Sequence, residues 1–187
     1  MTVYKETKKE ADRKIRERRK ERERYVISMN VKDDGGFLSE YSENETPIIS
    51  ADVADFIESS TARVRPGDVL TLKIKSNAID VDEKQLYDRA IREYYFEKYA
   101  RNRRELVRNY VISALLFAFG VLVLLFSAFL AYKDASSIWL EVVDIAAWVF
   151  LWEAVYIAFL ESRKLKIENV KYISYMSMDI VYENIDK

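Results

Sequence analysis

The segment Ile138–Leu160, IWLEVVDIAAWVFLWEAVYIAFL, is long and apolar enough to form a helix that crosses a membrane. It also contains Glu141, Asp144 and Glu153, and no Lys or Arg. A charged side chain inside a bilayer is costly, and such residues usually face a partner or a wet cavity. The placement of these three acids therefore decides how the helix packs.

A second apolar segment precedes this one. Residues 109–132 contain no charged residue, and Tyr110 and Tyr132 bracket them as interfacial aromatic residues do. A short polar stretch, 133–137, separates the two segments. We therefore expect an antiparallel hairpin of two transmembrane helices, at 110–132 and 138–160.

The basic residues predict the orientation of this hairpin. Lys98, Arg101, Arg103, Arg104 and Arg108 precede the first span, and four more basic residues follow the second, while the connecting stretch has one Lys. Loops rich in Lys and Arg stay in the cytoplasm. We expect a multi-pass protein of the cytoplasmic membrane with both termini cytoplasmic.

A helical wheel separates the acids of the second span. Asp144 lies on the side that carries the expected helix-packing residues, which are Ala147, Trp148, Ala154 and Ala158. Small residues on a polar side mark a packing face. We expect Asp144 to face the first span or a second copy, with Ser113, Gly120 and Ser127 as candidate partners. Trp148 and Trp152 are interpreted as packing between helices.

Glu153 points the opposite way, and Glu141 lies near the end of the span and is expected to be interfacial. Three arrangements relieve Glu153: it is protonated, it extends toward the inner interface, or another chain covers it. We favour a homo-oligomer with partial protonation. Asp144 and Glu153 then either hold helices together or line a proton or cation path.

Residues 25–80 predict a small α+β cytoplasmic domain. Alternating residues indicate strands at 25–32 and 69–75, with a turn at Asp33–Gly36 and a short return strand at 37–41. Ser50 is a candidate N-cap for the intervening helix. A β-grasp-like arrangement is one candidate fold.

The remaining segments complete the organisation. Residues 81–109 predict a long helix, opened by Asp82 and Gln85, that leads into the membrane. Its aromatic residues are interpreted as core or interfacial. In the cytoplasmic tail, 161–187, alternation at Met176–Tyr182 predicts a strand that joins the sheet. Residues 1–24 hold mostly charged residues and predict a solvated helix, or a basic arm that touches anionic lipids or an acidic partner.

The composition argues against several classes of function. The net charge is −1, and the chain has no His and no Cys. The commonest general base, metal ligand and thiol nucleophile are therefore missing, and no phosphate-binding or nucleophile motif is present. We expect no enzymatic activity, no cofactor, no metal and no nucleic-acid partner.

The stretch DIAAWVFLWEAV, together with AIREYYFEKYARNRRELVRN before the first span, resembles a widespread uncharacterised family of prokaryotic two-span membrane proteins. The family pattern has a Gly-Trp pair followed by Leu-Trp in the second span. Ala147 and Trp148 stand at the first pair here, and Leu151 and Trp152 at the second. The resemblance covers about residues 45–165. It implies the two-span topology and a prokaryotic inner membrane, and no activity.

Two functions remain open at this point. One is a membrane-tethered module whose cytoplasmic domain binds an unknown cytoplasmic protein or small ligand, with membrane lipids and a second copy as further partners. The alternative is a small oligomeric proton or cation pathway that this domain gates.

Overall fold

The computed structural model describes residues 6, 9, 10, 13, 24–43, 46–133 and 136–185. The expected charged helix or arm at 1–24 lies almost entirely outside these residues. The chain divides into two units, each described separately below. Unit 1 comprises residues 1–101 and 168–187, and unit 2 comprises residues 102–167.

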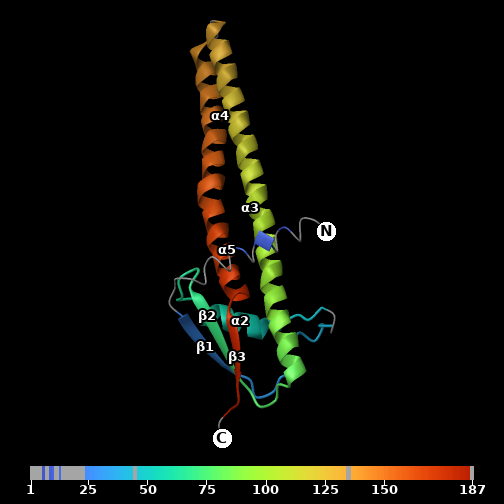
Figure 1. Ribbon diagram of the computed structural model, residues 1–187. Helices are drawn as coiled ribbons and strands as arrows, with labels where there is room; N and C mark the ends of the chain where they lie inside the picture. The colour runs from blue at the N-terminus through green and yellow to red at the C-terminus, as the bar shows by residue number, and fades with distance from the viewer. Residues whose placement is uncertain are drawn as a thin grey trace. The chain divides into compact units, whose positions relative to one another are not determined.

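The sheet of unit 1 has three strands in the order β1-β2-β3 (Figure 1). They are β1 (Arg24–Asn30), β2 (Val69–Lys75) and β3 (Asp179–Glu183). Both neighbouring pairs run parallel. Parallel neighbours need a crossover connection, and α2 (Ala51–Ser60) supplies it between β1 and β2.

The β-grasp-like arrangement is therefore not the fold of this unit, because it requires an antiparallel hairpin at its start. The return strand expected at 37–41 is also wrong. Leu38 forms only an isolated antiparallel bridge with Ile49. Phe37 is buried instead, and its ring stacks on Tyr87 at a centroid distance of 4.3 Å. Burial of a large aromatic side chain outweighs the alternating pattern that suggested a strand.

The starts of two helices show how the sequence defines their ends. The Ser50 side chain accepts a hydrogen bond from the Val53 N–H and is the N-cap of α2, as expected. The long helix α3 (Val81–Tyr132) begins one residue earlier than Asp82. Its capping box uses Glu83, whose carboxylate accepts the Asp80 N–H at 2.7 Å.

One face of the sheet carries the core of unit 1. Ile27, Leu72 and Ile74 are buried against α2, the first part of α3 and α5 (Ser162–Met176). Of the five clustered aromatic residues interpreted as core or interfacial, Tyr94 is half-buried and the other four are buried: Tyr87, Tyr95, Phe96 and Tyr99. Removing a large apolar side chain from water contributes about 1.5–3 kcal/mol, so this face dominates the stability of unit 1.

The tail strand expected at Met176–Tyr182 starts three residues later, because α5 continues to Met176. The Arg92 guanidinium donates to the Met176 carbonyl at 2.5 Å and to the Met178 carbonyl at 3.3 Å, across the junction of helix and strand. β3 then pairs with β2, with Ile180 opposite Leu72. β3 is thus separated from β2 by about a hundred residues of sequence and still joins the same sheet.

Unit 2 is built from two antiparallel helical segments that lie side by side (Figure 1). One is the second part of α3. The other consists of α4 (Ser137–Tyr156), the π-helical segment η1 (Ile157–Glu161) and the start of α5. The two expected spans fall within these segments. Both stretches are long and apolar enough to cross a membrane.

Candidate functional site

The packing face between the two helices of unit 2 is made of small residues. On α3, Ser113, Gly120 and Ser127 recur every seven residues, and all three lie against the facing helix. On α4, Ala147 and Ala154 are buried, also seven apart. A seven-residue repeat keeps one seam of each helix on its partner. Small side chains at that seam let the backbones approach closely.

Gly120 shows how close this approach is. A Cβ atom at this position would lie 2.8 Å from Cγ of Leu151 and 3.3 Å from the Leu151 backbone nitrogen. The first distance is shorter than carbon atoms tolerate, so Leu151 occupies the space that a side chain would need. The glycine is therefore required by packing rather than by its backbone conformation.

Three side chains of α3 also form hydrogen bonds across the seam. The Ser113 hydroxyl donates to the Ala154 carbonyl at 2.7 Å. Nearer the sheet end of the helix, the Asn109 amide donates to a Glu161 carboxylate oxygen at 3.4 Å, and the Asn102 amide donates to the Leu165 carbonyl at 2.9 Å. Buried polar groups need such partners. Polar contacts thus hold the part of the seam that lies between Asn102 and Ser113 on α3.

The structure corrects part of the expected packing face. Ala147 and Ala154 lie in the seam, as expected, and Ala158 is half-buried. Trp148 is 67% exposed and Trp152 is 62% exposed, so neither packs between the two helices of this chain. The seam is centred on Ala147 and Ala154. At about 100° per residue, Asp144 lies roughly 60° away from Ala147 around the axis of α4.

All three acids of α4 lie on the outer surface of unit 2. Asp144 is exposed, so it does not face the first span of its own chain. Glu153 is exposed as well, on the opposite side of the helix, as the wheel indicated. Glu141 is exposed near the start of α4.

Large apolar side chains surround these acids. Leu122, Phe129, Ile145 and Phe159 are among those that are mostly exposed. In the most apolar 18 residues of α3, only 11% is buried, and in those of Ser137–Met176 only 17%. A core helix of a soluble protein would be mostly buried. An apolar surface of this extent marks an interaction site for lipid or protein.

Unit 1 contains a cleft of about 500 Å³. Its walls come from the end of β1, the following turn and the first turns of α2. Met29, Phe37 and Phe56 give it an apolar lining, and Lys32, Asp33 and Asp52 add charged groups. The cleft lies outside the carboxyl end of β1 and is wide open to solvent.

Sequence reasoning did not find this cleft. It identified the turn at Asp33–Gly36 and the cap at Ser50 separately. The crossover from β1 through α2 to the parallel strand β2 brings the two together. The expectation of an antiparallel hairpin would have placed the chain after β1 elsewhere. The Asp-Asp-Gly-Gly turn followed by a capped helix is also typical of a strand-to-helix connection, and this pattern could have indicated the cleft.

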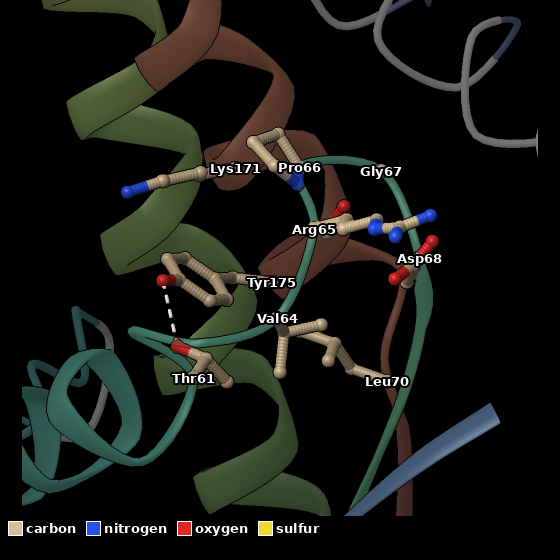
Figure 2. Close-up of a pocket in the computed structure, with 10 residues that line it drawn as sticks. Thr61, Val64, Arg65, Pro66, Gly67, Asp68, Leu70, Lys171 and Tyr175 are labelled. Atoms are coloured by element: carbon tan, nitrogen blue, oxygen red, sulfur yellow. Dashed lines mark hydrogen bonds between the residues drawn. The ribbon is translucent and has the colours of Figure 1, made fainter. Parts of the chain in front are cut away.

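A second cavity, between the end of α2, the 65–68 turn and α5, is much smaller (Figure 2). Its volume is about 10 Å³, which is at most the space of one water molecule. The Thr61 and Tyr175 hydroxyls share a hydrogen bond of 2.8 Å at its edge. Burial is the largest cause of the raised pKa of Tyr175. This contact ties α2 to α5 and is structural.

Several charged groups of unit 1 outside the cleft form ion pairs. Lys98 donates to Glu58 at 2.7 Å and lies over the Tyr94 ring. Burial opposes its charge, but hydrogen bonds to Glu58 and Tyr94 leave the pKa of Lys98 raised. The ammonium of Lys73 on β2 is bonded to Glu183 on β3 and lowers the pKa of that carboxyl. Within the described residues, no group of three His, Cys, Asp or Glu is arranged to hold a metal ion.

Comparison with protein-family models, with curated proteins and with solved structures finds no match for this chain. The resemblance of residues 45–165 to a two-span family stays a prediction. The candidate site is accordingly defined by geometry alone: the outer surface of α4 with its acids, and the cleft of unit 1.

Proposed function

We propose that this chain is a non-enzymatic integral membrane protein whose cytoplasmic domain binds a partner and is tethered by an oligomerising two-helix hairpin. The observation that carries this proposal is the exposed apolar surface of unit 2. Leaving so many large apolar side chains in water would cost about 25 cal/mol for each Å². Lipid removes that cost. The proposed location is the inner membrane of a prokaryote.

The acids on this surface support an assembly rather than a single hairpin. A carboxylate in the centre of a bilayer costs at least about 2.5 kcal/mol. Asp144 and Glu153 are both exposed in the single chain, and Trp148 lies one turn after Asp144. A second copy seated on this surface would cover an acid and bury an indole together. We therefore propose a homo-oligomer formed through α4.

The cleft of unit 1 supports the binding role. It combines an apolar floor with both signs of charge at its rim, which suits a peptide segment or an amphiphilic small molecule. The occupant is proposed to be a cytoplasmic protein or a small ligand. Phe56 is partly exposed at its edge and would make the contact that identifies the site.

Proton or cation conduction is a second candidate, favoured by the same two acids. Geometry restricts it. In a ring of copies around one axis, a single side of α4 faces the pore, and Asp144 and Glu153 lie about 180° apart on that helix. At most one of them lines such a pore. The other then points away from the pore axis, so the two acids have different roles in this candidate.

The topology has a direct test, because the chain contains no Cys and any introduced thiol is unique. Ser137→Cys lies at the start of α4, and Ser42→Cys lies in unit 1. In intact cells, an impermeant maleimide should label the first variant, and should label the second only after the membrane is opened. Equal labelling of both in intact cells would refute the tethered topology.

The two candidate functions separate in liposomes. Wild type, Asp144→Asn and Glu153→Gln are reconstituted, and proton and cation fluxes are measured alongside chemical crosslinking. Crosslinked oligomers without flux support the binding module. Flux that one substitution abolishes and the other leaves intact supports a pathway lined by one acid. A monomer in every preparation would contradict both.

A further inference from the structure

A group of cations lies at one end of unit 2. Residues 102–109 and 161–167 together contain six Lys or Arg and only two acids. The Asn102–Leu165 and Asn109–Glu161 hydrogen bonds join these two stretches, so the cations from both helices lie at the same level along the hairpin. Sequence alone separates them by more than fifty residues. We call these six cations the basic collar.

Both acids of this region already have partners. Glu105 accepts a hydrogen bond from Arg108 at 3.3 Å, and Glu161 accepts one from Asn109. Arg104, Arg163 and Lys164 are exposed, and none of them forms an ion pair within the part of the chain that the structure describes. Within the described residues, these three cations of the collar therefore have no acidic partner.

The collar borders directly on the apolar surface. Tyr110 follows it on α3, and the Lys166 ammonium lies 5.3 Å from the centre of the Tyr110 ring. A tyrosine beside a lysine at the end of an apolar helix is typical of the headgroup level of a bilayer. At the opposite end of the hairpin, Lys133 is the only basic residue of the connecting stretch. The two ends thus differ strongly in charge.

We propose that the basic collar binds anionic phospholipid headgroups in preference to zwitterionic ones. This inference rests on the proposed membrane insertion, which would bring the collar to the depth of the lipid phosphates. Guanidinium and ammonium groups donate charge-assisted hydrogen bonds to phosphate oxygens. Attraction of each cation near an anionic surface is worth on the order of a fivefold preference. The occupant is lipid rather than free phosphate, because the apolar surface below the collar receives the acyl chains.

The test uses the full chain in bilayers that contain a spin-labelled lipid, either phosphatidylglycerol or phosphatidylcholine. The fraction of immobilised label gives the relative association constant of each lipid. Wild type should prefer phosphatidylglycerol several-fold, and this preference should fall with salt. The triple variant Arg104→Gln, Arg163→Gln, Lys164→Gln should lose most of it. Inorganic phosphate at millimolar concentration should not displace the lipid.

Two controls isolate the cause. Lys133→Gln removes a cation from the opposite end and should leave the preference unchanged. Arg104→Lys with Arg163→Lys keeps the charge and should retain it. Equal association of both lipids with wild type, or an unchanged preference in the triple variant, would overturn the proposal. Displacement by inorganic phosphate would also overturn it, in favour of a soluble anion.

Failure of membrane insertion itself is distinguishable. The same vesicles are washed with alkaline carbonate, which removes proteins that only adhere to the surface. If the chain is released, the proposed spanning topology fails. If the chain is retained and shows no lipid preference, the topology stands and the inference about the collar fails.

Discussion

Units 1 and 2 have opposite arrangements of large and small side chains. In unit 1, Leu72, Ile91 and Tyr95 are fully buried, and the solvent side of the sheet is polar apart from Val26 and Val181. In unit 2, the buried positions are mostly Ala, Gly, Ser and Asn, while Leu, Phe and Trp lie outside. The difference shows that the two units are suited to different solvents. Apolar burial drives folding in water, but in lipid close packing and hydrogen bonds take its place.

The largest expected effect tests the apolar core of unit 1. Leu72→Ala leaves a cavity in the central strand, and such changes cost about 2–5 kcal/mol. We expect unit 1 of this variant to become protease-sensitive at a lower denaturant concentration than in wild type. Pulse proteolysis that detects cleavage within α2 measures this change. Trp148→Ala is the matched control in unit 2, because its side chain is exposed, and it should leave the resistance of unit 1 unchanged. Equal losses in both variants would contradict the comparison.

The second effect tests the small-residue seam. Gly120→Leu forces a side chain into the space that Leu151 occupies, and overpacking of this kind costs about 1–3 kcal/mol. Thermal unfolding in detergent micelles should shift to lower temperature. Ala118→Leu adds the same side chain at an exposed position of α3 and should shift it far less. The seam assignment is wrong if Ala118→Leu is the more damaging change.

A smaller effect tests the hydrogen bonds of the seam. Ser113→Ala removes the donor to the Ala154 carbonyl, and such bonds between membrane helices average about 0.6 kcal/mol. The loss should be measurable by steric trapping in micelles and below that of Gly120→Leu. The exposed Ser137→Ala is the control. A loss above about 2 kcal/mol would indicate that the serine does more than this one bond.

The smallest effect concerns pH and belongs to the solvent side of the sheet. The folded pKa of Glu183 lies below its usual value of 4.5, so its bond to Lys73 stabilises unit 1 above that pH. This contribution is lost as the pH falls through the lowered pKa and the carboxylate is protonated. The melting temperature of wild type should exceed that of Glu183→Gln slightly at pH 7, and the difference should disappear once Glu183 is protonated. A difference that grows as the pH falls would refute the assignment.

The sequence predicted the parts of the fold that depend on local pattern. Both apolar helices, the Ser50 cap and a tail strand that joins the sheet follow from spacing and residue type. Strand direction did not follow, because alternation at 25–32 is the same in parallel and antiparallel sheets. The short apolar stretch from Phe37 then suggested a strand, whereas its burial depends on Tyr87, fifty residues away.

The candidate site was predictable to a similar degree. The wheel correctly separated Glu153 from the small residues, because helical geometry is regular. Trp148 lies outside the seam of a single chain, which is centred on Ala147 and Ala154, and only the position of α3 reveals that centre. The basic collar and the cleft both require segments that are distant in sequence to meet. Neither can be inferred from one segment by itself.

The π-helical segment η1 determines where the second helix can tolerate a change in its length. The small buried residues Ala147 and Ala154 are seven residues apart, whereas the next small buried residue, Ser162, follows after eight, with Ile157 also buried between them. Asn169 then follows Ser162 after seven. The wider turn at 157–161 absorbs one surplus residue, as an insertion into a regular α-helix would require. Deleting one residue there should leave both flanking faces in phase, whereas deleting one from 145–153 should rotate the acids of α4 by about 100°.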